Sequence, residues 1–210
     1  MSLDKPTQGQ DAPEDKKGFS RRTFLHGVGA GAGAVGVLTS EEAQAAAGDS
    51  APVGPDPVKI SLRINGGSKE LSVEPRVTLL DALRNRLDIT GAKKVCDRGT
   101  CGACTVMVDG EPVYSCSMLA LEAQGHSIET IEALSTSDED MHPIQKAFVD
   151  HDAQQCGFCT PGFVMATKAL LDKNKNPSMK DVEDGLSGNI CRCGTYVGLR
   201  KAAMEAAKGA

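Results

Sequence analysis

The residues of this chain best suited to chemistry are its eight cysteines, which form two groups of four. The first group has the spacing C-x4-C-x2-C-x11-C, and the second has C-x2-C followed 31 residues later by C-x-C. The members are Cys96, Cys101, Cys104 and Cys116, then Cys156, Cys159, Cys191 and Cys193. C-x4-C-x2-C is the plant-type spacing for a [2Fe–2S] cluster. The spacing therefore predicts an iron–sulfur site in the first group, although its fourth cysteine follows sooner than in free plant ferredoxins.

Glycines lie between the cysteines of the first group. Gly99 and Gly102 would let backbone N–H groups approach the sulfurs and donate hydrogen bonds to them, which raises the reduction potential of a cluster. Such closely wrapped loops favour one shared metal centre for each group of cysteines.

Three other interpretations of the cysteines compete with this one. Disulfides would need pairs, and eight cysteines allow 105 pairings, but sulfurs separated by one or two residues close no stabilising loop. An all-cysteine zinc site usually consists of two C-x2–4-C pairs, a form that neither group has. A redox C-x-x-C motif at Cys156 and Cys159 would leave Cys191 and Cys193 unexplained.

Composition limits the classes of protein to which the chain can belong. The net charge of −5 argues against a nucleic-acid binder, and 40% hydrophobic with 24% charged residues argues against wholesale disorder. No apolar run is long enough to suggest a membrane-spanning helix, so no stable membrane insertion is expected. The chain has no Trp and only 3% aromatic residues. Because aromatic residues contribute most to a core, metal clusters are expected to help hold the chain together.

The segment 58–134 is predicted to be a mixed sheet crossed by one helix. Val58–Ile64 alternates as a half-buried strand, and Asn65-Gly66-Gly67 turns it into a second strand through Val73. Thr78 is positioned to cap a helix that begins at Leu79. Further strands are expected at 105–108, 112–115 and 127–131.

The segment 135–210 is predicted to be helical. Pro161 can open one helix, a second is expected over Met179–Leu186 and ended by Gly188-Asn189, and a third over 197–207. His126, His142 and His151 are interpreted as surface or helix-end residues. Met165 and Met204 are interpreted as core residues, and the acidic run 138–140 as a solvated loop.

The first 45 residues have the features of an export signal. Residues 20–25 (SRRTFL) precede a short Gly/Ala/Val stretch and small residues that fit a cleavage site. The adjacent arginines resemble a twin-arginine signal, with His26 at a position usually held by Lys. Because that route carries folded proteins, a protein that receives its clusters in the cytosol could use it. A linker is expected at 46–57.

Three motifs resemble one protein family. Residues 96–106 (CDRGTCGACTV), 155–162 (QCGFCTPG) and 188–194 (GNICRCG) resemble the small iron–sulfur subunit of the xanthine dehydrogenase/aldehyde oxidoreductase family of molybdenum hydroxylases. The resemblance covers about Val58 to Ala207. It implies an α+β chain with an N-terminal β-grasp, plant-type ferredoxin-like domain and a C-terminal all-α helical-bundle domain, each holding a [2Fe–2S] cluster.

The resemblance also assigns roles to particular residues. Cys96, Cys101, Cys104 and Cys116 would hold the cluster near a flavin subunit, and the other four cysteines the cluster near molybdopterin. Gln155 would hydrogen-bond the pterin, and Cys193 would lie nearest to its edge. Arg192 would either tune the cluster or be an exposed residue without a role.

The implied function is electron transfer within a molybdenum-dependent aldehyde oxidoreductase. This chain would carry no substrate-binding catalytic residue. Molybdopterin with its molybdenum would belong to a large partner subunit, and FAD to another, unless a cytochrome-type acceptor takes its place. The expected location is the periplasm. The alternatives are an enzyme that hydroxylates nitrogen heterocycles and a free-standing ferredoxin-like carrier.

Overall fold

The first two strands form the antiparallel hairpin predicted from their alternating pattern. The computed structural model describes residues 54–135, 137 and 141–209. β1 (Val58–Ile64) and β2 (Gly67–Val73) pair along their whole length. Asn65 and Gly66 take the left-handed backbone conformation that a two-residue turn requires, with φ of 51° and 78°.

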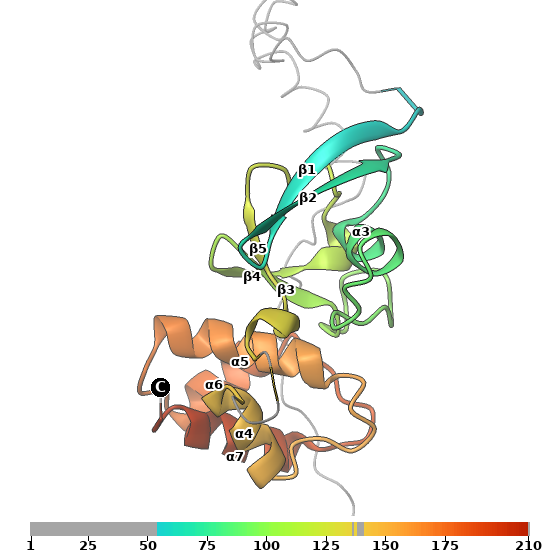
Figure 1. Cartoon of the computed structure of the whole chain (residues 1–210). Coiled ribbons are helices and arrows are strands. Elements are labelled where there is room, and N and C mark those ends of the chain that lie inside the picture. The colour runs from blue at the N-terminus through green and yellow to red at the C-terminus, as the bar shows by residue number, and fades with distance from the viewer. Residues whose placement is uncertain (1–53, 136, 138–140, 210) are drawn as a thin grey trace, which may run out of the picture. The chain divides into compact units, whose positions relative to one another are not determined.

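A five-stranded mixed sheet forms the first part of the described chain (Figure 1). Its order is β2-β1-β5-β3-β4, with β3 (Thr105–Val108), β4 (Glu111–Tyr114) and β5 (Ser127–Glu129). β1 and β5 run parallel, and the long connection between them includes α3 (Leu79–Arg86). The Thr78 hydroxyl accepts a hydrogen bond from the Asp81 N–H, as predicted for its cap. Leu79, Leu80 and Leu83 of α3 pack into the core under the sheet.

Four helices form the second part. They are α4 (Pro143–Asp150), α5 (Thr160–Lys173), α6 (Met179–Leu186) and α7 (Tyr196–Ala206). Their core includes the fully buried Phe148, Phe163 and Leu199. Together, the sheet and helices confirm the predicted α+β fold.

β3 connects the two parts because it is buried on both faces. Val106 and Val108 pack into the sheet core, whereas Met107 packs against Met165 and Ala169 of α5. A strand that is covered on both sides typically has a continuous apolar sequence, and residues 105–108 (TVMV) form such a sequence. The ferredoxin-like and helical parts therefore share an apolar contact and belong to one compact unit, Val53–Ala210.

Several boundaries differ from the sequence predictions. β5 ends at Glu129, and Ile131 begins a short 3-10 helix, Ile131–Ala133. The strand predicted at 112–115 begins at Glu111 and ends at Tyr114, because Ser115 belongs to a second 3-10 helix, Ser115–Ser117. Helix α4 was not predicted, since its signals are a Pro at its first position and an unusual cap, the ring of His142.

Other sequence interpretations are confirmed. His126 is exposed and lies 2.5 Å from Asp109, while His142 and His151 stand at the two ends of α4. Met165 is fully buried and Met204 packs against the helical core. Arg192 is exposed. The export signal, most of the linker and the acidic run 138–140 lie outside the described residues.

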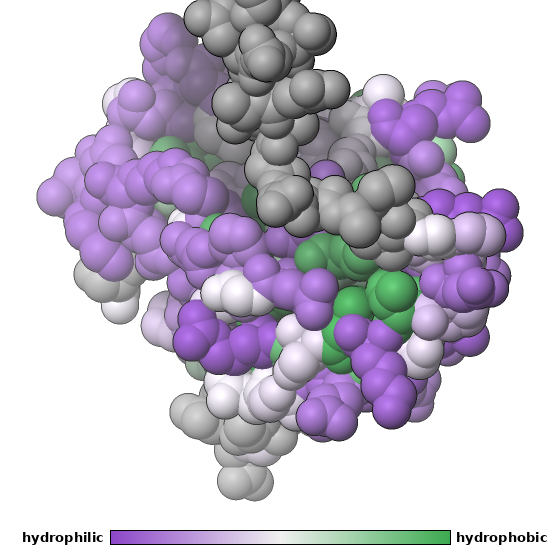
Figure 2. Space-filling view, turned by 90° about the horizontal axis from the view of Figure 1, so that it is seen from above, coloured by the Kyte–Doolittle hydropathy of each residue, from purple (hydrophilic) through white to green (hydrophobic). Residues whose placement is uncertain are grey.

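Hydrophobic surface is limited in the view of Figure 2, where most of the described surface is hydrophilic and green areas are small. Within the described part of the chain, no helix combines the length and apolar character that crossing a membrane requires.

Candidate metal centres

Strand pairing brings two distant cysteines of the first group together. Thr105 at the start of β3 pairs with Tyr114 at the end of β4, so the residues just beyond them, Cys104 and Cys116, become neighbours. The N–H and hydroxyl of Ser115 both donate to the Cys104 carbonyl, at 3.3 and 2.7 Å. The tight hairpin at Asp109-Gly110 thus explains why only 11 residues separate Cys104 from Cys116.

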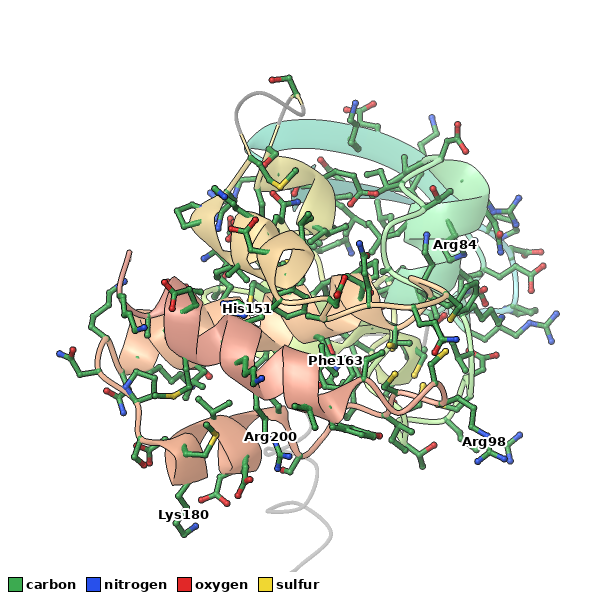
Figure 3. All side chains as sticks on the ribbon, turned by 90° about the horizontal axis from the view of Figure 1, so that it is seen from below. Arg84, Arg98, His151, Phe163, Lys180 and Arg200 are labelled. Carbon is green, nitrogen blue, oxygen red and sulfur yellow. The ribbon has the colours of Figure 1, made fainter. Side chains whose placement is uncertain are left out.

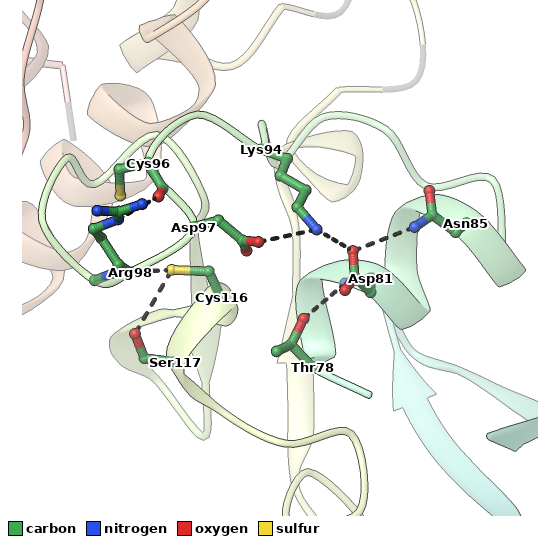
Figure 4. Close-up of polar contacts among 10 residues, drawn as sticks. Thr78, Asp81, Asn85, Lys94, Cys96, Asp97, Arg98, Cys116 and Ser117 are labelled. Atoms are coloured by element: carbon green, nitrogen blue, oxygen red, sulfur yellow. Dashed lines mark hydrogen bonds and ion pairs between the residues drawn. The ribbon is translucent and has the colours of Figure 1, made fainter. Parts of the chain in front are cut away.

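The loop 96–101 wraps the other side of this site (Figure 4). The Gly99 N–H donates to Cys116 Sγ at 3.3 Å and the Thr100 N–H to Cys96 Sγ at 3.4 Å. Gly99 has a φ of 70°, the conformation predicted for a glycine whose N–H approaches sulfur. Gly102 differs from the prediction, because its carbonyl, and not its N–H, makes the contacts seen here. That carbonyl accepts hydrogen bonds from Thr105 and from Asn189 of the helical part.

An ion-pair cluster anchors this loop to α3. Lys94 Nζ lies 2.8 Å from an Asp81 carboxylate oxygen and 3.1 Å from one of Asp97 (Figure 4). The hydrogen bonds with Asp81 and Asp97 raise the pKa of Lys94. Arg98 extends outward at the rim of the molecule (Figure 3). The charged end of the loop therefore lies at the surface, whereas Cys101 at its other end is buried.

Helix ends position the second group of cysteines. Cys156 and Cys159 immediately precede α5, and Cys191 and Cys193 lie between α6 and α7. The Thr195 hydroxyl lies 3.1 Å from Cys191 Sγ, and the Tyr196 hydroxyl accepts from the Cys191 N–H at 2.9 Å. The Tyr196 ring packs edge-on against Phe163, whose place inside the helical part is visible in Figure 3. Packing of the Tyr196 ring against the buried Phe163 therefore fixes the loop that carries Cys191.

The eight thiols, all free, lie as four neighbouring pairs. Cys193 Sγ and Cys156 Sγ are 3.5 Å apart, and in each of the other pairs one thiol lies close enough to its neighbour to influence that neighbour's pKa. Those pairs are Cys96 with Cys101, Cys104 with Cys116, and Cys159 with Cys191. Among the described residues, no three His, Cys, Asp or Glu side chains converge as a site for one metal ion. Two pairs per site suit a [2Fe–2S] cluster, in which each of two irons takes two thiolates.

Burial separates an inner from an outer sulfur in these sites. Burial raises the pKa of Cys104 to about 11 and that of Cys159 to about 12. A hydrogen bond with Thr100 lowers the pKa of Cys96 to about 6. A buried thiolate requires a compensating cation, and a coordinated metal deprotonates a thiol outright. The buried thiols therefore fit metal ligands in both sites.

The two sites meet through a direct contact between their loops. The Ile190 N–H, next to Cys191, donates to the Cys101 carbonyl at 3.0 Å. The Tyr114 hydroxyl, in β4, donates to the Gly188 carbonyl at 2.8 Å. Cys101 and Cys191 are both buried. Their main chains thus form a short hydrogen-bonded connection between the two groups of cysteines.

The outer edge of the second site is open. Cys156, Cys193 and the neighbouring Gln155 are exposed. Large apolar side chains are exposed on the same loops and at the start of α7: Phe158 is 50% exposed, Ile190 51% and Val197 59%. Exposed apolar residues gathered on adjacent loops are characteristic of an interaction surface. The sequence predictions for Gln155 and Cys193 stay predictions, but both residues are placed where a partner could reach them.

We expect Thr195→Val to lower the reduction potential of the helical-part cluster alone. The substitution removes the hydroxyl beside Cys191 Sγ, and hydrogen bonds to sulfur raise the potential. A hydrogen bond worth ~0.5–1.5 kcal/mol corresponds to about 20–65 mV for a one-electron couple. An EPR-monitored redox titration measures both potentials. Thr100→Val is the matched control, because its hydroxyl bonds Cys96 and its loss should shift only the other cluster; equal shifts of both clusters would contradict the assignment.

Sequence reasoning missed Asn189, Tyr114 and Thr195 as residues of these sites. Asn189 was interpreted as part of a helix stop and lay within the 188–194 motif without a role of its own, and Tyr114 was interpreted only as part of a strand. No local pattern indicates these contacts of Asn189 and Tyr114, because the partner of Asn189 is 87 residues away and that of Tyr114 is 74 residues away. Thr195 is four residues from Cys191, so its proximity to a cysteine was the one available signal.

Comparisons with known proteins agree with this geometry. Residues 62–130 match the model of a 2Fe-2S iron-sulfur cluster binding domain, and residues 130–204 match that of a [2Fe-2S] binding domain. The chain is 45% identical to the nicotine 6-hydroxylase small subunit of Paenarthrobacter nicotinovorans, covering 72% of this chain and 90% of that subunit. It is 38% identical to the aldehyde oxidoreductase iron-sulfur-binding subunit PaoA of Escherichia coli O157:H7, covering 95% and 92%. The crystal structure of quinoline 2-oxidoreductase from Pseudomonas putida 86 superposes with a TM-score of 0.70 at 41% identity, covering 73% of this chain and 96% of that one.

Proposed function

Because the chain belongs to the iron–sulfur subunits of the xanthine dehydrogenase/aldehyde oxidoreductase family of molybdenum hydroxylases, we propose that it serves an enzyme that oxidises aldehydes. Its role is electron transfer through two [2Fe–2S] clusters. The aldehyde substrate is supported by the similarity to PaoA, which covers 95% of this chain and so includes most of the first 45 residues.

The observation that carries the electron-transfer role is the arrangement of the two sites. Each has an outer side near the surface, at Cys96 in one and at Cys156 and Cys193 in the other. Their inner sides are joined by the hydrogen bond from Ile190 to Cys101. When bound, each cluster accepts and releases one electron. The chain holds both clusters with its thiolates and gives them a fixed connection.

Each of the two cysteine sites would face a different partner subunit with its outer side. On the helical side, the exposed Gln155 and Cys193 would face the molybdopterin of a large molybdenum subunit, with the apolar residues around them in the contact. On the ferredoxin-like side, the loop at Cys96 would face the acceptor, which is FAD in a further subunit or a cytochrome-type haem. Similarity to the nicotine 6-hydroxylase small subunit makes heterocycle hydroxylation the second candidate reaction.

Purification of the tagged full chain from its native cells tests this function. We expect a complex that contains molybdenum and about four iron atoms per copy of this chain, since two [2Fe–2S] clusters each contain two. Offered a panel of aldehydes and nitrogen heterocycles, the complex should oxidise aldehydes to carboxylates. Oxidation of heterocycles alone would favour the second candidate. Isolation as a stable monomer without a molybdenum subunit would contradict the proposal.

Export by the twin-arginine route is part of the proposal. Replacing both Arg21 and Arg22 with Lys should keep the protein in the cytoplasm, because that route requires the arginine pair. Immunoblots of periplasmic and cytoplasmic fractions measure the distribution. Lys16 and Lys17, replaced together with Arg, provide the matched control and should leave export unchanged. Equal periplasmic amounts of the Arg21/Arg22 variant and the parent would contradict this route.

A further inference from the structure

A buried amide lies in the contact between the two cluster-binding loops. Asn189 is only 6% exposed, and its side-chain Nδ2 donates to the Gly102 carbonyl at 2.9 Å. Asn189 precedes Ile190, whose N–H donates to the carbonyl of Cys101. Two consecutive residues of the second loop therefore bond two consecutive carbonyls of the first.

The Gly102 carbonyl does not depend on Asn189 for a partner. It also accepts from the Thr105 N–H at 3.1 Å and the Thr105 hydroxyl at 2.6 Å. Removing a third donor from a buried carbonyl that already accepts from two others leaves no unsatisfied acceptor, so it causes no desolvation penalty. The bond from Asn189 therefore adds a connection between the loops rather than satisfying an otherwise unpaired group.

The glycines around Asn189 show how closely the loops approach. A Cβ added to Gly102 would lie 2.6 Å from the Asn189 amide, and one added to Gly162 would lie 3.1 Å from its Nδ2. Both distances are shorter than ordinary van der Waals contact. The amide is thus enclosed by main chain of the ferredoxin-like part and of α5, and it has one place to lie.

We propose that Asn189 is a positioning residue for electron transfer between the two clusters. By holding its own loop against Gly102, it keeps the adjacent Ile190 N–H on the Cys101 carbonyl and so fixes the separation of Cys191 from Cys101. In the step concerned, one cluster loses one electron and the other gains it, with no bond broken and no proton moved. The inference rests on the electron-transfer function proposed above.

Two substitutions of Asn189 test the proposal in the assembled enzyme. Asn189→Leu keeps the branched shape with a somewhat larger side chain, Asn189→Ala removes that shape, and both remove the donor. Thr105→Val is the matched control, because it removes a hydrogen bond to the same Gly102 carbonyl without touching the second loop. Iron content and the two reduction potentials, from EPR-monitored titration, establish that both clusters are present and unchanged.

Two measurements then report on the connection itself. Rapid-freeze EPR after mixing with substrate should show electron passage between the clusters slowed about tenfold in both Asn189 variants, since small misplacements of reacting groups cost rate steeply. After full chemical reduction, the splitting from spin–spin interaction between the clusters should decrease. This second measurement needs neither substrate nor partner, so it separates a failure of this inference from a failure of the proposed function.

Slower passage and weaker splitting in the Asn189 variants, with Thr105→Val like the parent, would support the positioning role. Unchanged rate and splitting in the Asn189 variants would overturn it, as would equal losses in Thr105→Val. Loss of a cluster from both Asn189 variants would also overturn it, because the residue would then act in cluster retention.

Discussion

Replacing Cys193 with Ser is expected to remove the cluster of the helical part and to prevent substrate from reducing the remaining cluster. Cys193 and its neighbour Cys156 form the exposed side of that site, 3.5 Å apart. Ser is a poor substitute for a thiolate, and the loss of one of four ligands opens the site. Iron should fall from about four to about two atoms per chain, as one [2Fe–2S] centre is lost. Substrate electrons would then have no entry into this chain.

Cys116→Ser is the matched variant on the other side. It should also halve the iron content, but the helical-part cluster should still be reduced by substrate, since Cys116 is buried in the ferredoxin-like part. Iron analysis and EPR of the substrate-reduced complexes measure both effects. Equal loss of cluster reduction by substrate in the two variants would argue against entry at Cys193.

Replacing Gly162 with Ala is expected to cause the second large effect, by separating the two parts of the chain. The added Cβ would lie 2.3 Å from the Gly102 carbonyl oxygen and 3.0 Å from the Ala103 Cα. Both obstacles are main chain, so they cannot rotate away as a side chain could. Such overpacking costs about 1–3 kcal/mol of stability, and in a chain of this size Tm should fall by several degrees. The spin–spin splitting between the clusters should decrease as well.

Gly185→Ala provides the control for this prediction. Gly185 also lies in the end turn of a helix, α6, so both substitutions bring a similar preference of Ala over Gly, which is at most the about 0.5–1 kcal/mol found in helix interiors. Its added Cβ would meet only the flexible side chain of Leu170, at 3.2 Å or more. Thermal unfolding of the iron-loaded protein measures both variants, and we expect the Tm of Gly185→Ala to be unchanged or slightly higher. A Gly162→Ala protein as stable as Gly185→Ala would show that the contact can relax.

Local signals in the sequence predicted most of the fold. The alternation in β1, the Asn-Gly turn, the Thr78 cap and the helix over Met179–Leu186 each depend on residues within a few positions, and each was found where expected. Where the local signal was weak, the prediction failed. Helix α4 begins at a His cap, which few helices use, and β5 is cut short because Ile131 turns into the contact with α5.

The sequence by itself determined the eight thiols and the chemistry they suit, because that chemistry depends on residue type and on the spacing of the cysteines along the chain. Only the tertiary structure decided how the thiols combine. It pairs Cys156 with Cys193 and Cys159 with Cys191, although the spacing allows the opposite pairing as well. It also places Asn189 on Gly102, 87 residues away. Contacts of this kind depend on how strand β3 and helix α5 pack together, a sum of many distant interactions that no short stretch of sequence contains.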